Sequence, residues 1–456
     1  MFLSTLISAE RNSSYIAVYK SLPKLILLVF MLAVTFRVFL ASILFNVELL
    51  FETLMEGLVF LYVAYRLAKR ALEKDWSVNS MEIYLGILFL FPILPAIAAV
   101  REFDQPFLYG LATYRDFYLL FGGLVVYNLL RSGELDIKLV EKAFVVLAII
   151  FMLFSYFLTV FVDPTQFQDT AISGSNTAKG ADVYYRLNMA LFFFGSVYFT
   201  VKAFYQKNLF YLAIALLFIF YVVFIRLDRT SIAVLLGGLG LFFMTGVRPK
   251  NQALSILQAI LPVATLVVIV YLFAPEVYTQ YYGMFIDVLN TANAAGSGSV
   301  EDDVRLMELD IAIRGFKENP LFGHGKVSTY FVEGGYSHFY GFFYSSDLGF
   351  FGYLFSSGIV GLIIIFAQFY FFFKYILSIK HIKNNVFLVS LKYTVIILAL
   401  DGLTTEYLVI YSGQTITLIM ILLYFYEQDK IIGRKLESEA KLKMAQQKSL
   451  EPALNE

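Results

Sequence analysis

Long apolar runs separated by short charged segments recur along almost the whole chain. A helix needs roughly 20 mostly apolar residues to cross a bilayer core, and most of the runs approach that length. The first run is too long for a signal-peptide core, and no small-residue cleavage pattern follows it, so we expect a retained anchor. The predicted transmembrane helices are twelve, near residues 24–45, 47–66, 82–100, 110–130, 142–162, 183–201, 209–226, 229–247, 254–274, 348–373, 386–401 and 407–426.

Composition supports an all-α polytopic membrane protein. Hydrophobic residues make up 59% of the 456 residues and charged residues only 15%, which excludes a disordered chain and argues against a soluble enzyme. The 48 Phe and 32 Tyr suit lipid-facing surfaces and interfacial belts. The 35 basic residues are balanced by 35 acidic ones, so a nucleic-acid partner is not expected. Cysteine is absent, which excludes disulfides and thiolate metal sites.

The distribution of Lys and Arg predicts the orientation of these helices. With the N-terminus inside, 23 basic residues fall on the inner side and ten on the outer side, while Arg37 and Lys392 lie within spans. This bias places both termini in the cytoplasm. Seven of the ten outer residues are Arg, against six of the 23 inner ones. Because a guanidinium grips phosphate bidentately, the outer face is suited to holding an anion.

The chain is expected to form one transmembrane domain over residues 1–426, followed by a cytoplasmic tail over residues 427–456. The domain includes a large extracytoplasmic loop at residues 275–346. Within this loop, residues 301–319 are predicted to form a helix that Pro320 ends, and residues 321–325 (LFGHG) a tight glycine turn.

The three histidines differ in their predicted roles. His381 lies in a basic inner loop and is expected to be inert. His324 stands between two glycines, where a hydrogen bond to the backbone is the ordinary interpretation. His338 precedes an inward-going span, and its imidazole is either an interfacial group or a general base.

The outer arginines form two pairs with different spacing. Arg226 and Arg229 are three residues apart, so they share one face of a continuous helix, either as a membrane-boundary pair or as an anion site. Arg305 and Arg314 are nine apart and lie on opposite faces of a straight helix. The second pair therefore cannot serve one site without a kink.

Three segments together resemble the bacterial O-antigen ligase and O-antigen polymerase superfamily of membrane glycosyltransferases. Residues 305–325 (RLMELDIAIRGFKENPLFGHG) are similar to the Arg-to-Pro-Leu-x-Gly-x-Gly segment of its large outer loop. Residues 338–352 (HFYGFFYSSDLGFFG) are similar to its His-Asn-x-x-Leu segment followed by Glu-Leu-Gly-x-x-Gly, although Phe339 replaces the Asn and Asp347 the Glu. Residues 229–240 resemble the superfamily's arginine that opens a hydrophobic span. The resemblance covers about residues 220–365.

This resemblance implies a GT-C-like fold and a metal-independent, cofactor-free glycosyl transfer on the outer, periplasmic face of the bacterial inner membrane. The donor would be a glycan on undecaprenyl pyrophosphate, and the acceptor a hydroxyl of another lipid-linked glycan or of lipid A core. A chain-length-regulating membrane protein is an implied partner. His338 is the candidate general base, and Arg229 and Arg305 are the candidate catalytic clamp on the pyrophosphate. The candidate substrate-binding residues are Arg226, Arg314, Asp347 and His324.

Several functions remain open at this point. A polymerase is favoured, because polymerases are the more divergent group and Arg229 to Gly240 and Arg314 to Gly325 share one spacing. A ligase would use the same donor with a different acceptor. A flippase for lipid-linked glycans would carry its ionisable residues near mid-membrane, and here they gather at one face. A purely structural membrane protein is the remaining alternative.

Overall fold

The structure is a computed structural model that describes residues 22–38, 45–73, 79–163, 173–175, 183–185, 187–226, 229–246, 304–341, 343–404 and 412–450. The span predicted near residues 254–274 lies outside these residues.

In the described part of the chain, the fold is a bundle of helices with one small β-ribbon. The helices of the first half are Leu22–Thr35, α2 (Phe45–Glu73), α3 (Ser80–Leu90), α4 (Ile93–Phe103), α5 (Phe107–Ala112), the 3-10 helix η2 (Arg115–Leu120), α6 (Phe121–Arg131), α7 (Ile137–Phe161), α8 (Ala190–Gln206), α9 (Leu209–Phe220) and the π-helix η5 (Tyr221–Arg226). Those of the second half are α10 (Arg229–Thr245), α13 (Val304–Glu318), α14 (Ser337–Tyr340), the 3-10 helix η7 (Ser345–Leu348), α15 (Phe350–Ser378), α16 (Val386–Thr404) and α18 (Ser412–Leu450). The antiparallel ribbon pairs β1 (Ser173–Ser175) with β2 (Val183–Tyr185).

Five helical segments among the described residues are long and apolar enough to cross a membrane, which supports a polytopic membrane protein. They are Ser80–Phe103, Ile137–Phe161, Leu209–Arg226, Phe350–Ser378 and Val386–Leu403. The structure differs from the sequence prediction at several places, and the span predicted near residues 110–130 is divided among α5, η2 and α6. Residues Val183–Tyr185 form β2, so the helix expected from residue 183 begins at Ala190. Arg37 lies in a turn after the helix that ends at Thr35, where its Nε is 3.2 Å from Glu52 Oε1.

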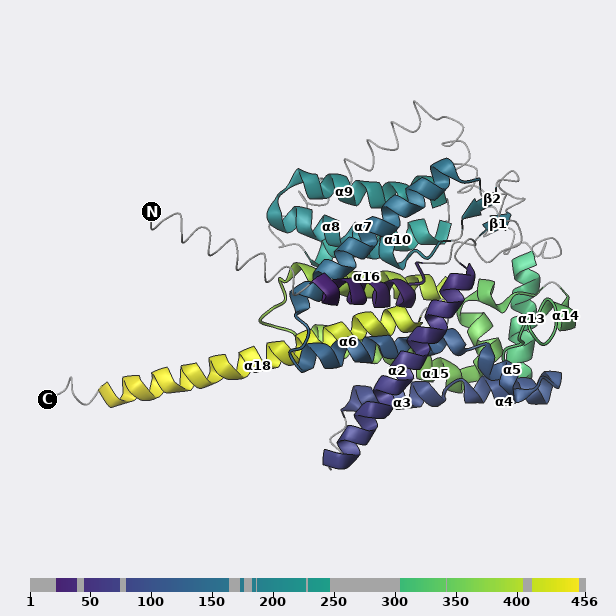
Figure 1. Cartoon of the computed structure of the whole chain (residues 1–456), viewed down its shortest axis with the longest axis horizontal. Coiled ribbons are helices and arrows are strands. Elements are labelled where there is room, and N and C mark those ends of the chain that lie inside the picture. The colour runs from purple at the N-terminus through teal and green to yellow at the C-terminus, as the bar shows by residue number, and fades with distance from the viewer. Residues whose placement is uncertain are drawn as a thin grey trace.

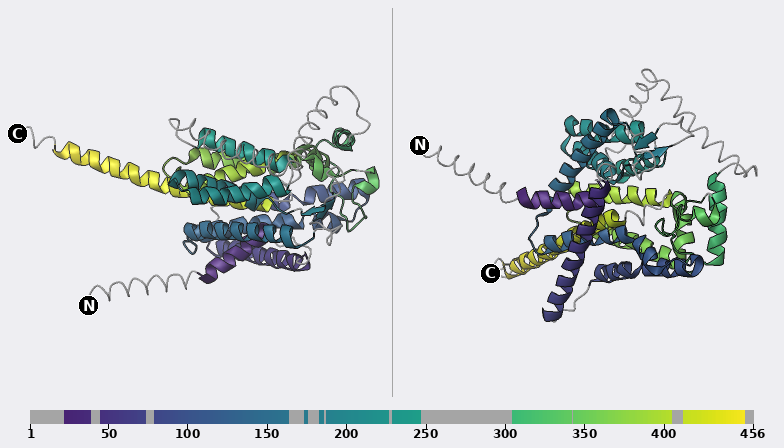
Figure 2. Two further views of the ribbon diagram at one scale, coloured as in Figure 1. Left: turned by 90° about the horizontal axis from the view of Figure 1, so that it is seen from above. Right: turned by 45° about the vertical axis from the view of Figure 1, so that its right-hand side comes forward.

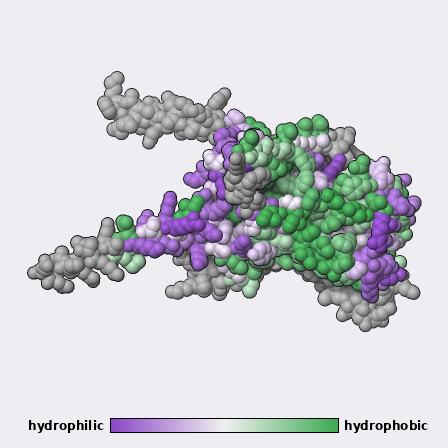
Figure 3. Space-filling view, turned by 90° about the horizontal axis from the view of Figure 1, so that it is seen from below, coloured by the Kyte–Doolittle hydropathy of each residue, from purple (hydrophilic) through white to green (hydrophobic). Residues whose placement is uncertain are grey.

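The bundle has two distinct ends. Helices α13 and α14 and the β1–β2 ribbon lie at one end, here called the loop end, and the second half of α18 projects from the opposite tail end (Figures 1 and 2). Seen from below, a hydrophobic area lies between hydrophilic areas near the two ends (Figure 3). This arrangement is what a bilayer requires of a protein that crosses it.

Helix α8 lies at the centre of the core. Its residues from Ala190 to Val201 are all buried, including Phe192, Phe193 and Phe194 at 0% exposure. It packs on α9 and on η5, where the rings of Phe192 and Tyr221 stack with centroids 4.3 Å apart. A helix that is apolar on every face is stable only when neighbours surround it, as α7, α9 and α16 do here.

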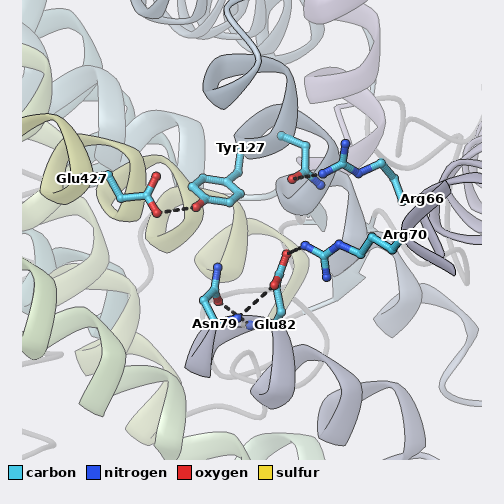
Figure 4. Close-up of polar contacts among 7 residues, drawn as sticks. Arg66, Arg70, Asn79, Glu82, Tyr127 and Glu427 are labelled. Carbon is cyan, nitrogen blue, oxygen red and sulfur yellow. Dashed lines mark hydrogen bonds and ion pairs between the residues drawn. The ribbon is translucent and has the colours of Figure 1, made fainter. Parts of the chain in front are cut away.

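Polar side chains join four helices near the tail end (Figure 4). Arg70 of α2 donates to Glu82 of α3 at 2.6 Å, and Glu82 also completes a capping box with Asn79. Tyr127 of α6 donates to Glu427 of α18 at 2.7 Å. These bonds satisfy groups that would be costly to bury unpaired, and they fix α2 beside α3 and α6 beside α18.

Candidate functional site

The predicted loop helix is present as α13, Val304–Glu318. Its end follows from the sequence, because Pro320 has no N–H to continue the helical ladder and disfavours helical geometry in the residue before it. The prediction of a helix over residues 301–319 ended by Pro320 is therefore confirmed for its described part. A tight turn at residues 321–325 follows, as expected.

This turn fits into a break in the long helix α15. Gly358 has φ +62°, so the helix is interrupted there. The N–H groups of Ile359 and Val360 donate to the carbonyls of Pro320 and Leu321 at 2.9 and 3.1 Å. In return, His324 and Gly325 donate their N–H groups to Phe355 and Ser356 at 2.8 and 2.9 Å. The turn thus satisfies backbone groups that the broken helix leaves open, the condition under which a broken helix is tolerated in a membrane protein.

The second glycine of the turn brings it directly onto α4. Gly325 has φ +83°, and a Cβ atom at this position would lie 2.3 Å from both Ala99 N and Pro95 O. Such a distance is far inside van der Waals contact, so only glycine fits. The turn is therefore held between the backbones of α4 and α15.

The imidazole of His324 lies inside this junction, with 3% of the residue exposed. Its Nε2 is 2.9 Å from the carbonyl oxygen of Gly315, the backbone bond that the sequence suggested. Glu102 Oε2 of α4 lies 3.6 Å from Nδ1, and Glu318 Oε2 of α13 lies 3.7 Å from Nε2. These contacts tie α13 to α4 through one side chain. The predicted substrate-binding role of His324 stays a prediction.

The second motif segment packs against the first. The N–H of Tyr344 donates to Glu308 Oε1 of α13 at 2.9 Å, and Tyr336, two residues before the segment, donates its hydroxyl to the carbonyl of Gly325. A small separate core beneath them contains Ala99, Phe103, Ala312, Val327, Tyr336, Phe343 and Phe355. Residues 304–350 thus form a compact cap at the loop end, which we call the loop cap.

His338 lies on the surface of the loop cap. It belongs to the one-turn helix α14, it is exposed, and its ring contacts that of Phe339 edge-on with centroids 5.1 Å apart. Asp347 lies in η7, which packs against both α13 and α15. The structure therefore assembles the two motif segments on one cap. For Asp347, as for Arg229 and Arg305, it describes the backbone alone.

The four candidate arginines lie in two separate parts of the fold. Arg226 ends η5, with 7% of the residue exposed, and Arg229 opens α10. Residues 227–228 lie outside the described part of the chain, so the predicted division between these two residues stays a prediction. Arg305 lies in the first turn of α13, whereas Arg314 is exposed on the same helix and pairs with Asp310 at 2.7 Å. Because α13 is continuous, the arginines at 305 and 314 occupy opposite faces, as their spacing predicted.

Sequence reasoning missed the residues that hold the loop cap in place. Glu102 and Phe355 are far from His324 in sequence, so no local pattern links them. Only 2% of Glu308 is exposed, and it bonds the backbone of the second motif segment. The break at Gly358 carried no signal either, because a glycine inside an apolar span is common.

Comparison with known proteins identifies the part of the chain that carries this cap. No curated protein matches the chain. Residues 214–366 match the family model described as O-antigen ligase, a range that contains all seven candidate site residues. Members of this family are glycosyltransferase-like enzymes. This match confirms, over residues 214–366, the resemblance to the O-antigen ligase and O-antigen polymerase superfamily.

Proposed function

We propose that this protein is a surface-polysaccharide polymerase of the bacterial inner membrane. It transfers a glycan from undecaprenyl pyrophosphate to a hydroxyl of another lipid-linked oligosaccharide on the periplasmic face. The observation that carries the proposal is the packing of the two motif segments, residues 305–325 and 338–352, into one loop cap. The cap lies at the loop end, opposite the Lys-rich second half of α18 (Figure 1). With the positive-inside rule, this arrangement favours a cap outside and both termini in the cytoplasm.

The proposed chemistry needs one base and one group of cations. His338 takes the proton of the acceptor hydroxyl as its oxygen forms a bond to the anomeric carbon of the donor. The bond from that carbon to the pyrophosphate oxygen breaks, and undecaprenyl pyrophosphate leaves with the bonding electrons. Arg229 and Arg305 neutralise the charge that develops on the pyrophosphate, with Arg226, Arg314, Asp347 and His324 as further substrate-binding residues. Because arginines supply this charge, the reaction needs no metal ion.

Exposure of His338 suits this role. An acceptor that arrives on its own lipid must bring a hydroxyl to the imidazole, which is possible only if the imidazole lies at the surface. The neighbouring Phe339, where the family usually has Asn, offers an apolar ring that is 42% exposed. Sugar rings stack on such aromatic faces, so Phe339 supports binding by contact instead of by a hydrogen bond.

A ligase is the second candidate, because the matching family model is described as O-antigen ligase. The two activities share the donor and differ in the acceptor alone. A ligase would transfer the glycan to lipid A core, with the same base and the same arginines.

One reaction separates these functions. The purified protein in lipid nanodiscs is given undecaprenyl-pyrophosphate oligosaccharide together with lipid A core, in the presence of a chelator, and the products are resolved by gel and mass spectrometry. Longer lipid-linked glycans are the expected product. Glycan on lipid A core would instead identify a ligase. Unchanged donor from folded protein would exclude both enzymes.

A further inference from the structure

A small polar pocket lies where the first residues of α8 and α18 meet the last turns of α16. Its volume is about 20 Å³, and its lining includes Asn188, Met189, Leu398, Asp401, Gln414 and Thr415. That space holds one or two water molecules, or one hydroxyl or hydroxymethyl group of a larger ligand. None of these residues belongs to the loop cap or to the proposed catalytic groups.

Among the described residues, none forms a hydrogen bond with the side chain of Gln414. Only 1% of the residue is exposed, and neither its Oε1 nor its Nε2 is bonded. Asn188 has its Oδ1 bonded to the N–H of Ala190 at 2.9 Å, but its buried Nδ2 is not bonded. Buried amides are nearly always satisfied, because leaving them unpaired is costly. Two such amides lining one pocket therefore indicate a polar occupant.

The lining selects a neutral hydroxyl over an ion. The carboxylate of Asp401, 4% exposed, repels an anion and accepts a hydrogen bond from a hydroxyl. A primary amide both donates and accepts, which matches the hydroxyl oxygen and its proton. A hard cation prefers several oxygen ligands of negative charge, and Asp401 is the single carboxylate of the lining.

The pocket lies at the same end of the bundle as the arginines of residues 226–229. Helices α8 and α9 run antiparallel, and Phe192 stacks on Tyr221. Asn188 lies four residues before Phe192 and Arg226 five after Tyr221, so both lie about one turn beyond the stack in the same direction.

Helices α10 and α16 also place the pocket at the same end of the bundle as Arg229. They are antiparallel, because Thr245 contacts Tyr393 at 2.7 Å while Gly238 packs on Ile397. From the level at which Gly238 packs on Ile397, Asp401 lies four residues farther along α16, a rise of about 6 Å. Arg229 lies nine residues before Gly238 on α10, a rise of about 13.5 Å in the same direction. Asp401 and Arg229 therefore differ in level by about 7–8 Å along the axis.

We propose that this pocket binds a hydroxyl or hydroxymethyl group of the donor glycan and so contributes to sugar specificity. The inference rests on the proposed function, because it assumes that the donor's pyrophosphate lies near Arg226 and Arg229. The amides of Gln414 and Asn188 donate hydrogen bonds to the oxygen of the sugar hydroxyl, and the carboxylate of Asp401 accepts a hydrogen bond from that hydroxyl.

The test compares two lipids in binding to the full-length protein in nanodiscs. One is undecaprenyl pyrophosphate carrying the oligosaccharide, and the other is undecaprenyl pyrophosphate without sugar. In Gln414→Leu, affinity for the glycan-bearing lipid should fall about tenfold, the loss of one buried hydrogen bond, while affinity for the sugar-free lipid is unchanged. Gln414→Asn, which keeps a shorter amide, should show a smaller loss and serves if the leucine variant does not fold.

Gln368 of α15 provides a matched control. It is also 1% exposed with both amide atoms unbonded, but it does not line the pocket. Gln368→Leu should leave both affinities unchanged. Unchanged glycan binding in Gln414→Leu would mean that the pocket holds water only, which would overturn the proposal. Equal losses of affinity for both lipids in Gln414→Leu would overturn it as well. So would the same loss of affinity in Gln368→Leu. Binding is measured in the cold, before transfer consumes the glycan-bearing lipid. A selective loss in a protein that transfers no glycan would refute the proposed function and leave the pocket standing.

Discussion

The imidazole of His324 stacks on the ring of Phe355, with centroids 4.8 Å apart and ring planes 19° apart. One residue belongs to the turn after α13 and the other to α15, on the helical turn just before its break at Gly358. The loop cap is thus joined to the membrane helices by a side-chain stack and by four backbone hydrogen bonds around it. Its position depends on this junction, and so does any chemistry on its surface.

Replacement of His324 should weaken the junction. His324→Ala removes the stack on Phe355 and the bond to the Gly315 carbonyl, and it leaves a cavity, which costs about 2–4 kcal/mol of stability. Thermal unfolding in detergent should show a clear drop in Tm. A variant with normal Tm but weakened donor binding would instead support a direct substrate-binding role for His324.

Glycine 325 should tolerate no side chain. Gly325→Ala places a methyl group 2.3 Å from the backbone of α4 and adds strain at φ +83°, so we expect the cap to shift and the Tm to fall with it. Gly133→Ala is the control, because Gly133 has φ +76° with nothing within 4 Å. It should lose about 1 kcal/mol from strain alone. Similar losses in both variants would show that the contact with α4 is unimportant.

His338 and His381 should differ in a transfer assay. His338→Ala should abolish turnover and retain donor binding, because the proposed role of the imidazole is proton removal and not the holding of the donor. His381→Ala, in the exposed loop between α15 and α16, should transfer at the normal rate. Near-normal turnover in His338→Ala would reject the assignment of the base.

Lysine should not replace arginine at the proposed clamp. Arg305→Lys keeps the charge but loses the bidentate fork, so transfer should fall by at least tenfold. Arg314→Lys should have a smaller effect, because its guanidinium is exposed and already pairs with Asp310. The measurement is the rate of glycan transfer at saturating donor, compared between the two variants. A larger loss in Arg314→Lys would reverse the ranking of the two residues.

Asp429 should make stability depend on pH. Its carboxylate lies just past the last predicted span and accepts three N–H bonds, from Lys380, His381 and Ile382 at 2.7–3.0 Å. Burial alone raises the pKa of Asp429, but these bonds outweigh it and lower the pKa below its ordinary value. The stabilisation is therefore complete above the unfolded-state pKa of about 3.9 and is lost as pH falls through the folded-state pKa.

The measurement for Asp429 is Tm against pH. Asp429→Asn should be less stable than the natural protein at neutral pH, by about 1–2 kcal/mol, and the difference should vanish in acid. Asp310→Asn, whose exposed carboxylate pairs with Arg314 on the helix surface, should change little at any pH. A constant deficit of Asp429→Asn down to acidic pH would contradict the assigned cause.

Much of the membrane architecture could be predicted from the sequence. Apolar runs of sufficient length located most of the described spans, because a helix in lipid must be apolar along its length. Pro320 marked the end of α13 for a local steric reason. The start of α8 was predicted too early, since Val183–Tyr185 is apolar enough for a span but pairs with β1. Short apolar runs do not distinguish strand from helix.

The sequence by itself determined the class of protein, the order of the motif segments and the opposite faces of Arg305 and Arg314, because these depend on local periodicity and spacing. The tertiary structure alone decided which distant groups meet. Glu102 reaches His324, Gly325 touches the backbone of α4, and the buried amides of Asn188 and Gln414 line one pocket. Such contacts depend on how helices pack, and packing is a property of surfaces that no single segment of sequence contains.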